Sequence, residues 1–433
     1  MNGSRAGFRD PGAARDAIAG AGLPCAAMSR DPVLLEECRA LKRAVEPFAT
    51  ISALRASPAW PDLEARFHRQ LGTPRRHAPH PSSPGARPPA GARPSVDAPP
   101  APGAPPPRES PDPSRVRAVH WNIEHGNWYE QVESALLGHP ELRDADLVLL
   151  NEVDLGMARA ANRDVAADLS RALGRHAVFA PMTLETTRGR DDDERMAAGR
   201  EDEEGLFGLA ILSRWPVGEV RIVELPSPEA VLFDVERQVG RYIALVAAIE
   251  RPGAPFVAVS THLEVHRARS HRAAQVHAIM AALRGERRPV VLAGDLNTHT
   301  FDRGLWHAPL AGASALLFAP GPALAERLLH PDRGPTRETL FDELKAAGFE
   351  WAPFVDHEPT LQLRFERLDE MRALFGPLHG AARRLLGWAE RRGRLRLDWF
   401  AGRGWRGGRG LTVADLDGPG RASDHAPIVA ELR

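Results

Sequence analysis

From Val116 to the C-terminus, short β-rich apolar runs alternate with longer helical patterns, and this alternation is what most limits the fold. Helical patterns cover Arg159–Leu173 and His266–Leu283. Because several strand-like runs follow one another directly and others are separated by helices, the pattern predicts a mixed α/β sandwich rather than a strictly alternating parallel fold. The strand-like runs are Val116–Asn122, Leu147–Glu152, Leu209–Ser213, Ile243–Ala248, Phe256–His262, Val290–Ala293, Arg396–Phe400 and Ile428–Leu432.

The residues before this region differ in composition. Residues 1–30 are rich in glycine and alanine without periodicity, and we expect them to be disordered. Residues 31–72 predict a short helical segment, with Asp31 as N-cap, Pro32 at the first helical position and a second helix over Pro61–Leu71. The apolar face of the first helix consists of Leu34, Leu35, Cys38, Leu41 and Val45.

Residues 73–114 contain fifteen prolines in 42 positions and almost no large apolar side chain. Such a stretch cannot bury enough surface to offset the entropy of ordering, so it predicts an extended linker. Residues 115–433 then form the main domain. Cys25 and Cys38 are the only cysteines and both precede that domain, so neither a disulfide framework nor a cysteine zinc site is expected in it.

Charge and hydropathy exclude some classes of protein. The formal net charge is −1, but residues 1–115 carry a balance of +5 and the rest a balance of −6, which argues mildly against an indiscriminate nuclease. No run of about 18 apolar residues predicts a transmembrane helix, and the N-terminus lacks the apolar core of a secretory signal. We therefore expect a cytoplasmic monomer.

Two longer segments interrupt the main domain. Residues 185–205 are strongly acidic, and we expect a solvated, disordered loop, with repulsion of a polyanionic substrate as the alternative. Residues 301–393 have a mainly helical pattern that includes the apolar Ala315–Phe318 and an amphipathic Met371–Trp388. These apolar residues either pack onto the domain or contact lipid acyl chains.

Six of these apolar runs carry, at or near one end, side chains that can bind metal or transfer protons. Asparagine and aspartate often end strands because they form turns, so a single instance means little. Six instances in one domain predict that carboxylates, carboxamides and imidazoles converge. Like charges so close would repel one another unless a cation neutralised them, and hard oxygen ligands favour Mg²⁺ or Mn²⁺ over zinc. The segments are Asn122-Ile123-Glu124, Asn151-Glu152, His262-Leu263-Glu264, Asp295-Leu296-Asn297, Asp398 and Ser423-Asp424-His425.

In this order, these motifs resemble those of the endonuclease/exonuclease/phosphatase superfamily, which includes DNase-I-like nucleases, sphingomyelinases and inositol-polyphosphate phosphatases. The resemblance covers Val116–Arg433. It implies a four-layer sandwich, in which two mixed β-sheets pack face to face with helices outside and the active site lies at one end.

The resemblance also implies roles for individual residues. Glu152 would be the principal metal ligand, with Asn122 and Glu124 beside it and Asp424 completing the site. Asp295 would orient or deprotonate the attacking water.

Five further residues would act on the phosphate or on its partners. Asn297 would hold both the phosphate and Asp295, and His262 would be a second phosphate contact. His425 would contact the phosphate or transfer a proton, with Asp398 fixing its tautomer. Arg241 matches the phosphate-binding arginine, with a solvated surface arginine as the alternative.

Other histidines, including His120 and His125, have no fixed partner in the sequence, and we expect them at the surface or behind the site. The predicted activity is divalent-metal-dependent hydrolysis of a phosphoester in a nucleic acid, a phospholipid or a sugar phosphate. Two alternatives stay open: an endonuclease using arginine-rich loops, and a catalytically silent binding module.

Overall fold

The computed structural model describes residues 31–79, 115–188, 192–227, 237–303, 308–364, 379–416 and 422–433. Residues 1–30, expected to be disordered, lie outside the described residues, as do residues 80–114 of the expected linker.

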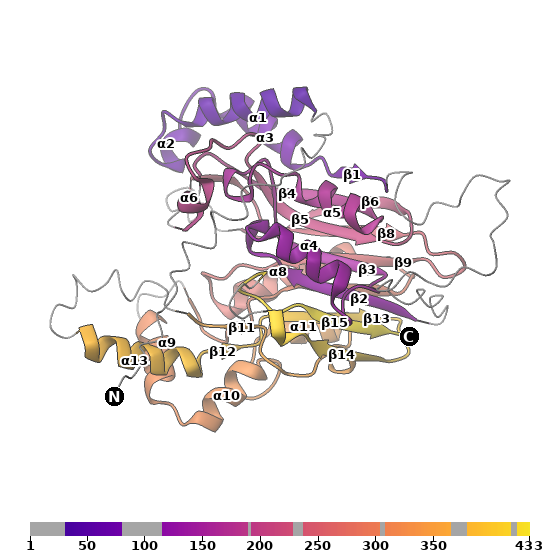
Figure 1. Cartoon of the computed structure of the whole chain (residues 1–433), viewed down its shortest axis with the longest axis vertical. Helices are drawn as coiled ribbons and strands as arrows, with labels where there is room; N and C mark the ends of the chain where they lie inside the picture. Colours follow the sequence, from indigo (N-terminus) through magenta and orange to yellow (C-terminus); the bar gives the residue numbers. More distant parts are fainter. Residues whose placement is uncertain are drawn as a thin grey trace, which may run out of the picture.

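The first sheet contains eight strands in the order β1–β4–β5–β3–β2–β15–β14, with β7 paired to β4 (Figure 1). Only β2 and β3 among these pairs run parallel, so the sheet is mixed. The strands are Arg75–His77 (β1), Val116–Asn122 (β2), Leu147–Leu155 (β3), His176–Glu185 (β4), Leu206–Ser213 (β5), Gln238–Gly240 (β7), Gly408–Thr412 (β14) and Ile428–Leu432 (β15).

The second sheet contains five strands in the order β13–β10–β9–β8–β6. It is also mixed, because β9 and β10 run parallel and the other pairs antiparallel. A further two-stranded ribbon joins Leu361–Gln362 (β11) to Arg394–Leu395 (β12). The strands of the second sheet are Val217–Glu224 (β6), Ile243–Ile249 (β8), Phe256–His262 (β9), Val290–Asp295 (β10) and Asp398–Arg403 (β13).

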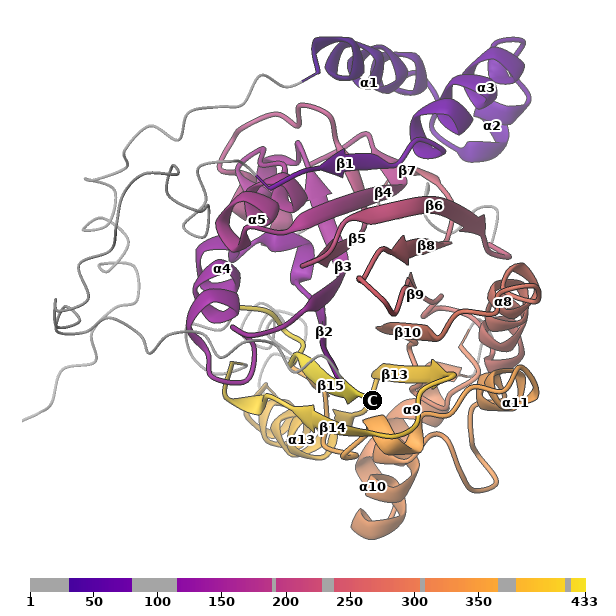
Figure 2. The same ribbon diagram turned by 90° about the vertical axis from the view of Figure 1, so that its right-hand side faces the viewer.

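The two sheets pack face to face with helices outside, which confirms the predicted four-layer fold (Figure 2). Helices α4 and α5 lie outside the first sheet, and α8 and α11 lie outside the second. The remaining helices belong to the N-terminal segment, the acidic segment and the insert. The helices are Pro32–Val45 (α1), Ile51–Arg55 (α2), Trp60–Leu71 (α3), Tyr129–Gly138 (α4), Val165–Leu173 (α5), Asp192–Ala197 (α6), Arg269–Ala282 (α8), Ala308–Phe318 (α9), Gly321–Leu329 (α10), Leu340–Ala346 (α11) and His379–Arg392 (α13).

Strand β3 explains why its sequence reads as a continuous apolar run. Successive side chains of a strand point to opposite faces. Leu147 and Leu149 therefore lie in the core between the sheets, whereas Val148 and Leu150 lie in the core under the outer helices. A strand covered on both faces needs apolar residues at every position.

Three strands that the sequence did not predict have identifiable reasons for their weak signal. Strand β4 contains Pro181, which is accommodated where its register with β5 shifts. Strand β6 is an edge strand whose side chains are partly buried or exposed, and β14 is an edge strand with two glycines and a single buried position. Neither β6 nor β14 has the unbroken apolar run on which the prediction depended, and the proline interrupts that of β4.

The N-terminal segment packs onto the main domain. Asp31 caps α1 by accepting hydrogen bonds from the backbone of Val33 and Leu34, as predicted. Buried residues of α1 and α3, among them Cys38 and Phe67, join the core on the outer face of the first sheet. The expected linker was wrong at Arg75–His77, because these residues pair with β4 as the edge strand β1.

The acidic segment 185–205 is not the solvated loop expected from its composition, at least over its described residues. Arg159 is 4% exposed, and its guanidinium donates to Asp154, Glu185 and Asp193 at 2.8, 2.9 and 3.4 Å. The Lys42 ammonium of α1 donates to the carbonyl oxygens of residues 202 and 203. The composition of this segment predicts exposure to solvent. Instead, two cationic side chains from distant positions in the chain, Arg159 and Lys42, hold it.

Cys38 provides a test of whether α1 is docked. The side chain is fully buried, and burial raises the pKa of its thiol to about 12. Because the thiolate is the reactive form, we expect iodoacetamide to alkylate Cys38 about 10³-fold more slowly in the folded chain at pH 8 than in urea. Mass spectrometry of the tryptic peptide measures both rates. Equal rates would show that α1 does not stay on the domain.

The described residues contain no helix long and apolar enough to cross a membrane.

Candidate active site

Strand register brings the polar strand ends together. In the second sheet, Asp295 at the end of β10 lies beside His262 of β9 on one side and Asp398 of β13 on the other. In the first sheet, Asn122 at the end of β2 pairs with Asn151 of β3. Because the ends of the two sheets face each other across the sandwich, these residues form one group.

Asp295 lies at the centre of this group. Its Oδ2 atom is 3.6 Å from His262 Nε2 and 3.8 Å from His425 Nε2. Asn122 Nδ2 also reaches the same oxygen, at 3.4 Å. The other carboxylate oxygen accepts the backbone N–H of Asn297 at 2.9 Å, which fixes the orientation of the carboxylate. The backbone N–H of Asp295 donates to Asn151 Oδ1 at 2.8 Å.

Gly294, next to Asp295, allows this close packing. A Cβ atom at this position would lie 1.9 Å from the carbonyl oxygen of Thr261 on the neighbouring strand. The glycine before Asp295-Leu296-Asn297 is therefore required by the approach of β9 to β10.

Asp398 holds two histidines at once. His425 Nδ1 lies 2.7 Å from its Oδ2 atom and His120 Nε2 lies 3.0 Å from its Oδ1 atom. The hydroxyl of Thr360 accepts the backbone N–H of Asp398 at 3.2 Å. All three members of the His–Asp–His group are buried. This arrangement leaves His425 Nε2 directed at Asp295.

Electrostatics reinforces the pairing of Asp398 with His425. Burial opposes charge on both groups, yet the carboxylates of Asp398 and Asp424 hold the pKa of His425 well above its usual value. Conversely, His425 and the hydrogen bond from His120 hold the pKa of Asp398 well below its usual value, against burial. His425 is therefore an imidazolium at neutral pH in the absence of other ligands.

Glu152 reaches the group through a β-bulge. The register between β3 and β5 shifts between Leu150 and Val153, and Glu152 adopts a φ of 54°. Such left-handed backbone in a non-glycine residue is costly and concentrates at functional sites. The bulge lets consecutive side chains serve the site: Asn151 bonds to β10, and Glu152 Oε1 accepts from Asn122 Nδ2 at 2.9 Å.

The Glu152 carboxyl is in an unfavourable environment for a charge. Burial first, and then the Asp424 carboxylate, raise the pKa of Glu152 to about 8. Its second oxygen lies 3.6 Å from His125 Nε2. Burial, followed by the charge of Arg159, lowers the pKa of His125 well below its usual value, so this imidazole is neutral and offers no counter-charge. A cation at this carboxylate would relieve the repulsion.

Three other predicted site residues occupy different positions. Asn297, with a φ of 49°, donates its side-chain amide to the carbonyl oxygen of Leu263 at 2.7 Å and so ties β10 to the end of β9. Glu124 is partly buried beside the group, and its backbone N–H donates to Asn122 Oδ1. The Arg241 guanidinium contacts Glu224 at 3.2 Å and His68 of α3 at 3.1 Å, and no contact places it in the described group.

Sequence reasoning assigned no role in the site to three residues of this group. His120 and His125 were expected at the surface or behind the site. His120 does lie behind it, where it shares Asp398 with His425. His125, in contrast, lies against Glu152. Asn151 links Asp295 to Ser260 of β9. The only signal was their position at the ends of β2 and β3, since each contact depends on a residue more than a hundred positions away or on the backbone turn after β2.

Ser423 has a structural role. Its hydroxyl donates to the carbonyl oxygen of Asn122 at 2.6 Å and accepts the backbone N–H of His425 at 3.1 Å. It therefore fixes the segment that carries Asp424 and His425 against the end of β2, and no contact with a described residue would make it a nucleophile.

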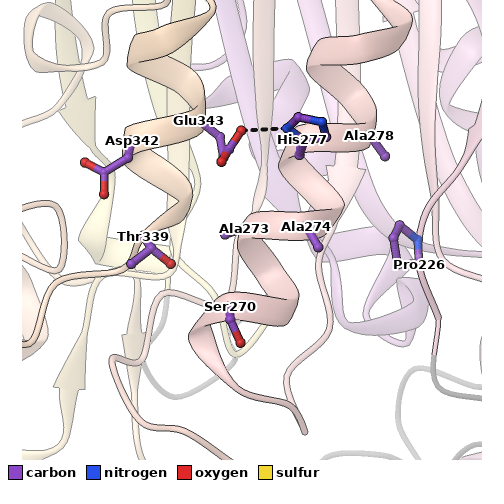
Figure 3. A pocket seen from close by; sticks show the side chains of 9 residues that line it. All are labelled: Pro226, Ser270, Ala273, Ala274, His277, Ala278, Thr339, Asp342 and Glu343. Carbon is purple, nitrogen blue, oxygen red and sulfur yellow. Dashed lines mark hydrogen bonds and ion pairs between the residues drawn. The ribbon is translucent and has the colours of Figure 1, made fainter.

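A separate surface pocket of about 590 Å³ lies between α8 and α11, outside the second sheet (Figure 3). His277 and Glu343 approach each other across it at 2.8 Å. It contains none of the strand-end residues and offers a mainly apolar surface, so it is not the candidate active site. Its lining residues are Pro226, Ser270, Ala273, Ala274, His277, Ala278, Thr339, Asp342 and Glu343.

Comparisons with known proteins agree with the motif order. The Endonuclease/Exonuclease/phosphatase family model matches residues 119–425. A search of curated proteins found no match.

Among solved structures, an endonuclease/exonuclease/phosphatase from Beutenbergia cavernae is 18% identical, with a TM-score of 0.43 and coverage of 74% of this chain and 72% of that one. The human Nocturnin catalytic domain with bound sulfate is 15% identical, with a TM-score of 0.42 and coverage of 74% and 93%. A family protein from Leptotrichia buccalis is 12% identical, with a TM-score of 0.45 and coverage of 73% and 99%.

Proposed function

The chain belongs to the endonuclease/exonuclease/phosphatase family, and on that premise we propose that it is a divalent-metal-dependent phosphoester hydrolase. The observation that carries the proposal is the meeting of Glu152, Asp295 and the Asp398–His425 pair at one end of the sandwich. Together these residues supply an anionic site for a cation, a carboxylate that can orient water and an imidazolium that can contact a phosphate.

The cation site that we propose uses Glu152 as principal ligand, with Asn122, Glu124 and Asp424 beside it. The chemistry fits Mg²⁺ or Mn²⁺, since the donors are carboxylate and carboxamide oxygens. Asp295, Asp398 and His425 also have donor atoms within 4.8 Å of one another. We favour a cation site at Glu152 over one at Asp295, Asp398 and His425. His425 and Asp398 are already paired with each other, whereas the Glu152 carboxyl has neighbouring carboxylates that raise its pKa. A bound cation would neutralise phosphate charge and polarise the ester.

Asp295 is the residue that we propose to orient the attacking water. Its carboxylate is fixed by the Asn297 backbone, and its Oδ2 atom is open to the two imidazoles. Burial lowers the pKa of His262, so His262 is a neutral donor suited to a phosphate oxygen. Asn297 is proposed to support both Asp295 and the phosphate.

His425 is proposed to contact the phosphate through Nε2 and to deliver or accept a proton there. Asp398 fixes the imidazole by accepting from Nδ1, so that Nε2 is the atom presented to the substrate. We also propose Arg241 as a phosphate contact. To reach a phosphate at the strand ends, its guanidinium would have to leave Glu224 and His68.

The substrate classes that we propose are nucleic acids, phospholipids and sugar phosphates. Arg159 pairs with Glu185 and Asp193 of the acidic segment, so part of the charge that would repel a polyanion is compensated. An assay must therefore include polymeric and small substrates.

Metal-dependent turnover is the direct test. We expect the purified full chain to hydrolyse at least one of plasmid DNA, a sphingomyelin analogue and bis-p-nitrophenyl phosphate in the presence of Mg²⁺ or Mn²⁺. EDTA should abolish this turnover and excess Mg²⁺ should restore it, because the phosphate charge is otherwise not neutralised. Product release is followed by absorbance or by gel.

Two outcomes would contradict the proposal. Turnover unaffected by EDTA would remove the metal from the mechanism. A folded chain without turnover of any of the three substrates with either metal would favour the catalytically silent module. His139→Ala, which changes a histidine paired with the exposed Asp415, serves as the matched control for histidine variants of the site.

A further inference from the structure

A second group of potential ligands lies in the insert, apart from the strand-end residues. It contains His330 directly after α10, Asp332 in the following turn, and His357 in the loop before β11. One ligand atom of each lies within 4.8 Å of those of the others. The two imidazole rings are tilted against each other with centroids 4.2 Å apart. We call these three residues the insert cluster.

The contacts of each histidine, a hydrogen bond for His357 and a longer approach to a carboxylate for His330, involve one ring nitrogen and leave the other for a ligand. His357 Nδ1 lies 3.2 Å from the carbonyl oxygen of Leu329, which leaves Nε2. His330 Nε2 lies 3.8 Å from a carboxylate oxygen of Glu326, which leaves Nδ1. Metal-binding histidines commonly direct their second nitrogen at a carbonyl or a carboxylate in this way, because that contact fixes the ring and its tautomer.

Two atoms of the insert cluster are buried without partners. His330 Nδ1 and Asp332 Oδ1 have no hydrogen-bond partner among the residues that the structure describes. The other Asp332 oxygen accepts from Trp351 Nε1 at 3.0 Å, so the carboxylate is held in place. A buried polar atom without a partner costs free energy, and here the two atoms belong to side chains with the same neighbour, His357.

We propose that the insert cluster binds a divalent transition-metal ion, and that zinc is its best match. The ligands would be His330 Nδ1, Asp332 Oδ1 and His357 Nε2. Two imidazole nitrogens with one carboxylate oxygen are donors that suit zinc, whereas the oxygen-rich strand-end site suits Mg²⁺ or Mn²⁺. With three protein ligands, water would complete the coordination.

The local charges are compatible with a bound cation. Arg333 lies nearby, but its guanidinium is paired with Glu326 at 2.8 and 3.1 Å. Asp332 supplies the negative charge within the cluster.

A metal here would join the end of α10 to the loop that supports Asp398. The His357 ring contacts Trp399 edge-on, with centroids 6.1 Å apart. Three residues further along, the Thr360 hydroxyl accepts the backbone N–H groups of Leu397 and Asp398 at 3.0 and 3.2 Å. The role that follows is structural: the ion would hold the insert against the strand that positions Asp398.

The test uses the full chain, stripped of metal and titrated with Zn²⁺ by calorimetry or with Co²⁺ by visible absorption. The titration uses the Glu152→Gln variant as background, because loss of this carboxylate weakens metal binding at the strand-end site. The zinc that still binds then reports on the insert cluster. We expect one equivalent of Zn²⁺ in that background. Asp332→Asn, which keeps the size of the side chain and an acceptor for Trp351, should weaken it at least about tenfold. His357→Ala should do the same.

The matched control is His277→Ala, which removes an exposed histidine paired with a carboxylate and should leave zinc binding unchanged. If His357→Ala fails to fold, as judged by circular dichroism, Asp332→Asn decides. Zinc binding that is lost in Glu152→Gln but unchanged in Asp332→Asn would overturn the proposal. The absence of zinc binding at micromolar concentration in the Glu152→Gln chain would overturn it as well.

Discussion

Replacing Glu152 with glutamine is expected to reduce kcat at least about 10³-fold with any substrate that the chain turns over. Glutamine has the same shape and can still accept the amide of Asn122, so the bulge at residue 152 should persist. The loss therefore reports the missing negative charge, which the proposed cation site needs.

The same substitution is expected not to lower stability in the metal-free chain. Burial and Asp424 raise the pKa of Glu152 to about 8, above its value in an unfolded chain. The ionised carboxylate is thus disfavoured by folding, and the metal-free protein loses stability as the pH rises from about 4.5 to about 8. A neutral glutamine avoids this loss. We expect Glu152→Gln to melt at or above the wild-type temperature at pH 8, as is typical when function conflicts with stability.

Initial rates in Mg²⁺ and melting curves in EDTA measure the two effects. Glu343→Gln changes a surface carboxylate paired with His277 and should alter neither. A Glu152→Gln enzyme with near wild-type kcat would exclude Glu152 as the metal ligand. Normal activity together with strong destabilisation would instead identify a structural carboxylate.

Much of the fold could be predicted because its central strands are buried on both faces. The predicted runs Phe256–His262 and Ile428–Leu432 coincide with β9 and β15. Consecutive apolar residues indicate such strands because both faces of the strand are covered. Strand β1 could not be predicted, since Arg75–His77 has no apolar run and is a strand only because the exposed edge of β4 accepts it. Likewise, nothing local indicates that Arg159 would neutralise acidic residues up to 34 positions away.

For the candidate site, residue types were predictable and pairings were not. The polar residues at the ends of the apolar runs identified Asp295, Asp398 and His425. A turn explains a single aspartate at a strand end, but it does not explain aspartate and histidine at several strand ends of one domain. That Asp398 also holds His120 depends on β2 and β13 lying in opposite sheets, with 278 positions between the two residues. The position of Arg241 against α3 similarly depends on how the N-terminal segment docks.

Asp398→Asn is expected to reduce kcat by about 10⁴-fold, the loss seen when the carboxylate that orients a catalytic histidine is replaced by an amide. The Asp398 carboxylate has an acceptor oxygen for each of two histidines, at 2.7 Å for His425 and 3.0 Å for His120. Asparagine has one acceptor oxygen and one donating amino group. One imidazole must then lose its partner or change tautomer, which would misplace the proton of His425.

The pH profile should change in a defined direction. Asp398 is the main group that holds the pKa of His425 above its usual value, against burial. Without that carboxylate the imidazolium loses its proton at lower pH. If the reaction needs the imidazolium, the alkaline limb of the kcat profile therefore moves to lower pH in Asp398→Asn, and residual activity is greatest under more acidic conditions than in the wild type.

Rates measured between pH 5 and pH 10 test both parts of this expectation. Asp342→Asn, at a surface carboxylate paired with Arg337, is the matched control and should leave both rate and profile unchanged. A kcat within threefold of wild type would mean that the orientation of His425 does not limit the reaction. A large loss with an unmoved alkaline limb would assign that limb to a group other than His425, because only a group coupled to Asp398 can respond to the removal of its charge.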